Sequence, residues 1–70
     1  MLAVRKAVSR REQYHDMKQA EARLSQLDAE YMKQHSNNSR YIYQVRGGGW
    51  VAVSQFLGKY NIEFYDSCPC

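Results

Sequence analysis

The placement of glycine and proline divides this chain into two unlike halves. All four glycines and the single proline lie after Arg46. Because these residues interrupt regular structure, the first half is free to form one long element. In the second half, Gly47-Gly48-Gly49 and Gly58 separate runs rich in aromatic and β-branched residues, which is typical of short strands joined by turns. The pattern predicts a helix followed by a sheet.

The length of 70 residues restricts the chain to a single domain, residues 1–70. A separate catalytic domain and cofactor domain would not fit. No uncharged run approaches the ~18 residues that a membrane-spanning helix needs, so no membrane association is expected.

Residues 10–35 are predicted to form one long amphipathic helix. Ser9 and Glu12 have the spacing of a capping box, in which a serine caps the helix and a glutamate three residues later reaches back. Asparagine and serine at 36–39 end the helix, because their side chains compete for backbone hydrogen bonds. Apolar residues recur every three or four positions, as on one helix face, at Tyr14, Met17, Ala20, Leu24, Leu27 and Tyr31.

Residues 41–65 are predicted to form a three-stranded antiparallel β-meander with strands at 41–46, 50–57 and 60–65. A three-residue loop would place Tyr43 opposite Val53, and a two-residue Gly58-Lys59 turn would place Val53 opposite Phe64. Paired residues share a face. The expected core face comprises Tyr41, Tyr43, Val45, Val51, Val53, Gln55, Leu57, Tyr60, Ile62 and Phe64. The outer face comprises Ile42, Gln44, Arg46, Trp50, Ala52, Ser54, Phe56, Asn61, Glu63 and Tyr65.

The expected fold is therefore α+β, with one long N-terminal helix packed on the three-stranded meander, a basic segment at 1–9 and a tail at 66–70. A 26-residue helix is ~39 Å long, whereas an eight-residue strand is ~26 Å. The apolar stripe would extend beyond the sheet, and a second copy of the helix would cover it. A homodimer is thus expected, with Tyr14, Met17, Leu24, Leu27 and Tyr31 at the contact.

Catalytic, metal and cofactor sites are not expected. His15 and His35 have no adjacent nucleophile, and they do not stand at metal-ligand spacings from Cys68 and Cys70. The glycine run lacks the phosphate-loop spacing. Without a nucleophile-base pair or a phosphate loop, the protein is not expected to be an enzyme. Two cysteines this close in sequence predict free thiols and a reducing compartment, hence a cytoplasmic protein.

Basic and aromatic side chains form the candidate binding site. Residues 1–11 contain four basic residues and no acidic one, at Arg5, Lys6, Arg10 and Arg11. The outer face adds Gln44, Arg46, Trp50 and Tyr65. An exposed sheet can enter the DNA major groove, where arginine pairs with guanine and glutamine with adenine.

The strand motifs resemble a known DNA-binding arrangement. Tyr41-x-Tyr43-x-Val45, Trp50-Val51-Ala52-Val53 and Gly58-Lys59-Tyr60 look like the meander of AP2-type and phage-integrase arm-binding domains. The resemblance covers about residues 41–66. It implies an exposed sheet whose arginine and tryptophan side chains contact DNA.

Two functions of different classes follow. The first is a small regulatory binding protein of phage or mobile-element type, which binds nucleic acid or a nucleoprotein through the sheet face and the basic N-terminus. The alternative is a stoichiometric inhibitor of anti-defence or host-takeover type, which blocks a site on a host protein. The mixed aromatic face and Glu63, which would repel phosphate, favour the alternative.

Overall fold

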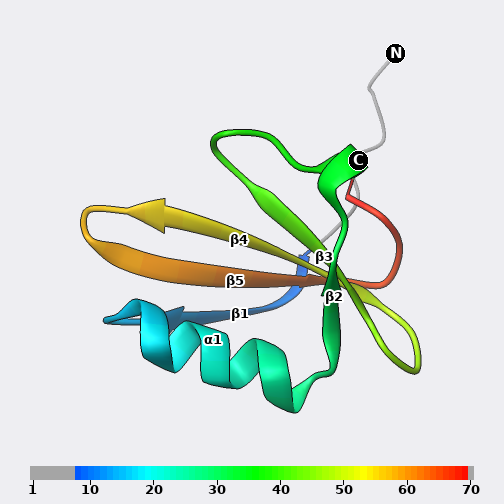
Figure 1. The fold of residues 1–70 in the computed structure, drawn as a ribbon, viewed down its shortest axis with the longest axis horizontal. Coiled ribbons are helices and arrows are strands. Elements are labelled where there is room, and N and C mark those ends of the chain that lie inside the picture. Colours follow the sequence, from blue (N-terminus) through cyan, green and yellow to red (C-terminus); the bar gives the residue numbers. More distant parts are fainter. Residues whose placement is uncertain (1–7, 70) are drawn as a thin grey trace.

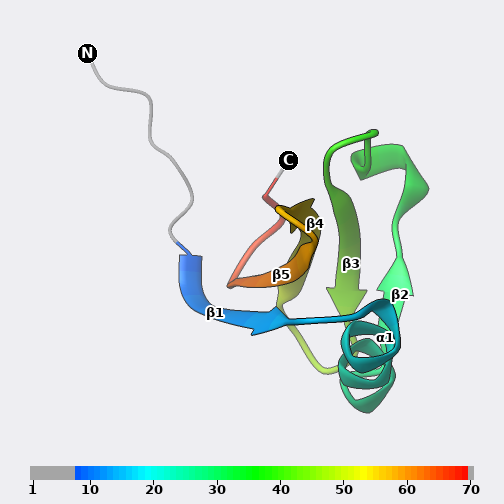
Figure 2. The ribbon, with the colours of Figure 1, turned by 90° about the vertical axis from the view of Figure 1, so that its left-hand side faces the viewer.

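The computed structural model describes residues 8–69, which form a curved five-stranded antiparallel sheet with one α-helix on one face and a short 3-10 helix near one edge (Figures 1 and 2). The elements are β1 (Val8–Tyr14), α1 (Met17–Gln26), β2 (Ala29–Tyr31), η1 (Lys33–His35), β3 (Tyr41–Val45), β4 (Trp50–Phe56) and β5 (Lys59–Tyr65).

The strand order is β1-β5-β4-β3-β2. Strands β2 to β5 are antiparallel neighbours in chain order, and β1 pairs with β5 at the far edge. Helix α1 connects the two edge strands across one face of the sheet and packs mainly against β1, β2 and β5. Figure 2 shows the helix on one side of the sheet only. We call the opposite surface the outer face.

The prediction of one long helix over residues 10–35 on a three-stranded meander is wrong. The segment contains β1, the ten-residue α1, β2 and η1. The N-cap is Asp16, whose carboxylate accepts a hydrogen bond from the Gln19 backbone amide at 2.9 Å. Beyond the C-cap Leu27, Asp28 adopts a φ of +50°, which a continuing helix does not allow.

Residues before Asp16 form a strand because they pair with the distant strand β5. Arg11 lies opposite Glu63, and Gln13 lies opposite Asn61. Both pairs join their side chains by hydrogen bonds of 3.1 Å. Cross-strand pairs of this kind stabilise a sheet. Local periodicity could not predict them, because the partners lie about fifty residues later in the chain.

The shorter helix removes the reason to expect a homodimer. At about 15 Å, α1 does not extend beyond the sheet. Of the residues expected at a dimer contact, Leu24 is buried in the core, and Tyr14 and Leu27 are half-buried against the core. Met17 and Tyr31 are exposed, the latter on β2.

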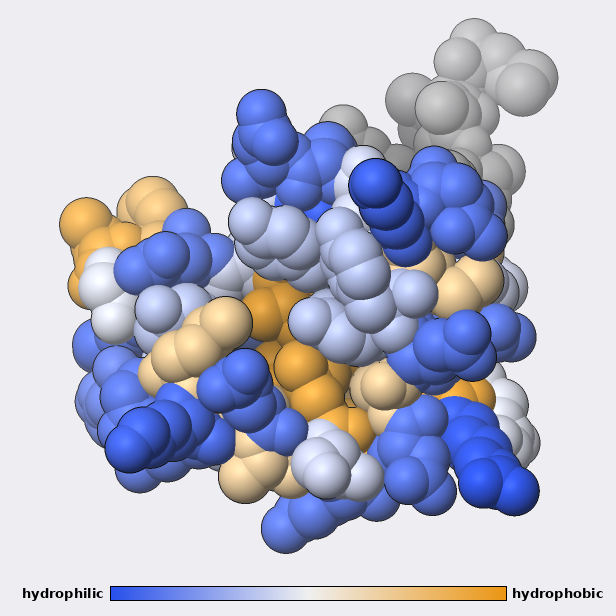
Figure 3. All heavy atoms as spheres, in the orientation of Figure 1, coloured by the Kyte–Doolittle hydropathy of each residue, from blue (hydrophilic) through white to orange (hydrophobic). Residues whose placement is uncertain are grey.

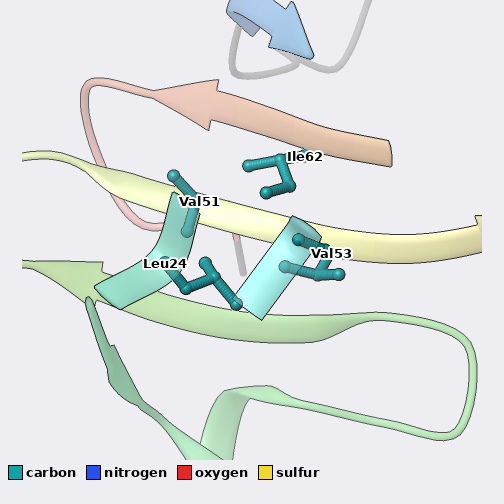
Figure 4. Close-up of a cluster of buried hydrophobic side chains, with 5 residues drawn as sticks. Leu24, Val51, Val53 and Ile62 are labelled. Atoms are coloured by element: carbon teal, nitrogen blue, oxygen red, sulfur yellow. The ribbon is translucent and has the colours of Figure 1, made fainter. Parts of the chain in front are cut away.

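The main core lies between α1 and the sheet. Its buried members are Ala20, Leu24, Val51, Val53 and Ile62. Figure 4 shows Leu24, Val51, Val53 and Ile62 gathered between the helix and strands β4 and β5. Leu24 and Ala20 are four residues apart and therefore share one helix face.

The register of both hairpins differs from the prediction by two residues. Tyr43 lies opposite Val51, and Val53 lies opposite Ile62. The β4–β5 turn is Leu57-Gly58 rather than Gly58-Lys59, because Phe56 and Lys59 form the last pair. A shift of two residues leaves every side chain on its predicted face, so the predicted sorting of the two faces is correct.

A second, smaller core covers part of the outer face. Ile42, Ala52 and Tyr65 are buried there, with Val8 and Trp50 packed against them. The Trp50 ring also meets His35 of η1 edge-on at 5.8 Å. Tyr65, which was predicted to bind a partner from the outer face, is therefore buried in this smaller core.

Two further observations concern localisation. Cys68 is disulfide-bonded, so the prediction of a free thiol is wrong at this position. The cysteines therefore no longer support the prediction of a reducing compartment. Cys70 lies outside the described residues. Among those residues, no helix combines the length and the apolar character needed to cross a membrane.

Candidate protein-docking surface

The most exposed large hydrophobic side chains of the described residues lie at the β4–β5 turn. Phe56 is 68% exposed and Leu57 is 84% exposed. We call residues 56–59 the hairpin tip. The tip lies at one end of the molecule, where Figure 3 shows a group of hydrophobic atoms at the periphery. The other exposed large hydrophobic residues in the described part of the chain are Met17, Tyr31 and Tyr41.

The backbone of the hairpin tip is strained at Leu57. Leu57 and Gly58 are the two central residues of the turn, and their φ angles are +53° and +76°. Two positive φ angles are characteristic of a type I′ turn, in which asparagine, aspartate or glycine is preferred at the first position. A leucine in this conformation costs about 1–2 kcal/mol. Leu57 is thus exposed to water and also held in a backbone conformation that is unfavourable for leucine. Such strain is found preferentially at functional positions.

A groove next to the hairpin tip is lined by tyrosines. It has a volume of about 260 Å³. We call it the tyrosine groove, and its lining residues are Met17, Glu21, Leu24, Tyr41, Tyr43, Val53, Ser54, Gln55 and Tyr60. Figure 3 shows a hollow near the centre of this face, with hydrophobic atoms at its floor and less hydrophobic side chains around it. Gln55 and Tyr60 line the groove and flank the hairpin tip in sequence, so the groove ends next to the tip on the helix side of the sheet.

The groove is open because α1 packs mainly against β1, β2 and β5 rather than against β3. The helix-side surface near the start of β3 is left without a helix over it, and Tyr41 is 45% exposed there. At the rim, Met17 in the first turn of α1 is 50% exposed.

Aromatic contacts extend the groove across β3 to the edge strand β2. The ring centroid of Tyr31 lies 5.5 Å from that of Tyr43 and 6.2 Å from that of Tyr41, with tilted ring planes. Burial is the main reason why the pKa of Tyr43 is raised, and the neighbouring charges of Tyr31, Glu21 and Tyr41 raise it further.

The outer face presents a different chemistry, because its charges are largely used within the fold. Glu63 accepts a hydrogen bond from Arg11 at 3.1 Å and another from the Tyr65 hydroxyl at 3.1 Å. The same hydroxyl accepts a hydrogen bond from Arg40 at 3.0 Å. Burial, followed by the hydrogen bond to Glu63, raises the pKa of Tyr65. This network fixes Tyr65 over the smaller core.

Three of the four predicted binding residues on the outer face do lie in one row. Gln44 is opposite Trp50, and Trp50 is opposite Tyr65. Tyr65 is buried and Trp50 is half-buried, so the row offers less contact surface than expected. Arg46 is exposed beyond the end of β3, where it lines an open depression that also contains Asp28 and Glu30.

The predicted basic residues do not form one surface. Arg10 lies on the helix side, where its guanidinium stacks 4.5 Å from the centre of the Phe64 ring and pairs with Glu12 at 3.0 Å. Arg11, the next residue, points to the outer face and pairs with Glu63. Arg5 and Lys6 lie outside the described residues.

Sequence reasoning missed the docking surface by assigning its residues to a covered core. Tyr41, Tyr43 and Tyr60 were placed on the core face, which is the correct side of the sheet but is only partly covered. Leu57 was placed there too, but it lies in the turn and is 84% exposed. One local signal existed. A leucine immediately before Gly58 in a two-residue turn is unusual, because the first position of a type I′ turn favours a residue that tolerates positive φ.

The chain matches no protein-family model, and no curated protein or solved structure matches it significantly. The resemblance of residues 41–66 to AP2-type and integrase arm-binding sheets therefore stays a prediction.

Proposed function

We propose that this protein is a small non-enzymatic binding protein that occupies a site on another protein. The observation that carries the proposal is Leu57, an 84% exposed leucine held at a positive φ beside the exposed Phe56. Folding alone gives no reason for this residue, because asparagine or glycine would fit the turn better. A partner pocket that buries the leucine would offset both the strain and the exposure.

The surroundings of the hairpin tip support this role. Protein interfaces are centred on large apolar and aromatic side chains that become fully desolvated. The tip and the adjacent tyrosine groove supply such side chains from three strands, β3, β4 and β5, and from helix α1. A stoichiometric inhibitor works in this way, since it needs only to fill a site on its target and no catalytic group of its own.

Nucleic-acid binding through the outer face is the second candidate. The observation that favours it is Arg11, whose side chain is 70% exposed although it pairs with Glu63. Lys59 is also exposed and stands on the same strand face as Glu63. Against this candidate, Glu63 neutralises part of the charge, and Asp28 and Glu30 lie beside Arg46.

One experiment separates the two candidates. The immobilised parent protein and Leu57→Asn are incubated with nuclease-treated lysate of the native cells, and the retained partner is then purified and titrated against each protein. Lys33→Asn, an exposed change on η1, is the matched control. We expect one partner that binds the parent and the control with defined stoichiometry and binds Leu57→Asn at least tenfold more weakly.

The salt dependence of partner binding distinguishes a protein interface from nucleic-acid binding. An apolar interface responds little to salt, whereas nucleic-acid binding weakens steeply through counterion release. Binding that is lost on nuclease treatment, falls steeply with salt and is insensitive to Leu57→Asn would refute the inhibitor proposal and favour the outer face.

A further inference from the structure

The tyrosine groove combines aromatic rings with a single type of charge. Three of its lining residues are tyrosines, and Glu21 is the one charged residue among the side chains that line it. A fourth ring, that of Tyr31, packs against Tyr41 and Tyr43 at the edge of the groove. Aromatic faces carry negative electrostatic potential. The rings and the carboxylate therefore favour the same sign of ligand charge.

The floor of the groove is apolar. Leu24 and Val53 line the groove from α1 and β4, and both are at least nine-tenths buried within the protein. Met17 adds an exposed thioether side chain at the rim. An occupant must accordingly bring aliphatic atoms to the floor and a positive charge to the rim. Lysine and arginine side chains have this build, with an aliphatic stem and a cationic end.

We propose that the tyrosine groove binds a lysine or arginine side chain presented by a segment of the partner protein. The inference rests on the proposed function, because it names the chemistry of the partner that the hairpin tip approaches. The cation lies over the tyrosine faces near Glu21, and the aliphatic stem lies against Leu24 and Val53. A phosphate or an acidic side chain is disfavoured at the same place by Glu21.

The test uses a probe that needs no identified partner. Nα-acetyl-lysine N-methylamide is titrated into the isotope-labelled parent protein, and its Nε-acetylated form, which lacks the charge, serves as the neutral comparison. Nuclear magnetic resonance reports the tyrosine ring signals. We expect saturable shifts at Tyr41, Tyr43 and Tyr60 with the charged probe and clearly weaker binding of the neutral one.

Two variants test whether the charged probe binds in the tyrosine groove. Glu21→Gln removes the carboxylate from an exposed position and should lower the affinity for the charged probe about two- to fivefold, the range of an exposed ion pair, with an unchanged circular dichroism spectrum. Glu30→Gln, an exposed change on β2 that does not line the groove, should bind the probe as the parent does.

Three outcomes would overturn the inference. Equal binding of the charged and neutral probes would make the groove purely apolar. Shifts that are absent from the tyrosines would place any binding elsewhere. Concentration-dependent self-association that Tyr41→Ala abolishes would make a second copy of the chain the occupant.

The inference and the proposed function can fail separately. Leu57→Asn is outside the groove, so it should leave the probe titration unchanged while weakening binding of the partner. If the partner binds through the hairpin tip but the probe does not distinguish charge, the proposed function stands and the inference falls.

Discussion

Arg23 of α1 and Glu12 of β1 form a two-point ion pair that joins the helix to the edge strand. The guanidinium Nε donates to Glu12 Oε1 at 2.8 Å, and Nη2 donates to Oε2 at 3.2 Å. The Tyr14 hydroxyl also donates to Oε1. Both partners of the ion pair are about one-quarter exposed or less, so water screens this pair less than a pair at the surface.

Because of the Glu12–Arg23 pair, we expect the free energy of unfolding to fall in acid. The hydrogen bond from Arg23 is the largest influence on the Glu12 carboxyl and, with Tyr14, holds its pKa below the ordinary value despite the opposing effect of burial. The free energy contributed by this lowered pKa is therefore present above pH about 4.5 and is lost as the pH falls through the folded-state pKa. Urea unfolding at about pH 7 and about pH 3 measures it.

Glu12→Gln is the matching variant. It should be less stable than the parent near neutral pH, and its stability should fall less on acidification because the titrating group is gone. If the variant loses as much stability in acid as the parent, the carboxylate of Glu12 is not responsible for the acid sensitivity.

Leu57→Asn should stabilise the fold while weakening partner binding. Asparagine tolerates positive φ and is favoured at the first position of a type I′ turn, so the free energy of unfolding should rise by up to about 1 kcal/mol. Urea denaturation measures the change. A lower stability than that of the parent would mean that Leu57 makes packing contacts that its 84% exposure does not suggest.

Leu24 and Met17 should respond very differently to truncation, although both belong to the apolar stripe of the sequence. Leu24 is buried in the core, so Leu24→Ala should cost about 2–5 kcal/mol of unfolding free energy. Met17 is 50% exposed, and Met17→Ala should change stability by about 0.5 kcal/mol or less. Similar losses in the two variants would contradict the position of α1 on the sheet.

Ser36 should be important for stability although it lies in a loop. Its hydroxyl donates to the Met32 carbonyl at 2.8 Å and accepts a hydrogen bond from the Ile42 amide at 2.8 Å. Ser36→Ala removes both bonds and should cost about 1–3 kcal/mol. Ser39→Ala in the same loop is the control, since Ser39 is exposed and only its backbone amide is bonded, to Asn37. Equal stability of the two variants would refute this role.

The candidate site was only partly predictable. The pleat predicts that Gln44, Trp50 and Tyr65 share the outer face, and this is confirmed. Their pairing in one row was not predicted, because the true register differs by two residues. The burial of Tyr65 does not follow, because it depends on Arg40 and Glu63 reaching its hydroxyl. The hairpin tip was not predicted, because the turn lies one residue earlier than the glycine alone suggested.

By itself, the sequence determined where the three strands from Tyr41 to Tyr65 lie and which of their side chains share a face. The pleat alternates with a period of two, so even a register error of two residues preserves the faces. Only the tertiary structure decided which secondary structure residues 8–35 adopt. Their charged and apolar periodicity fits a helix locally, but Arg11 and Gln13 find partners on β5 that lie about fifty residues away. That pairing makes residues 8–14 an edge strand and shortens the helix. Helix α1 then packs against β1, β2 and β5, and Tyr41 on β3 stays 45% exposed.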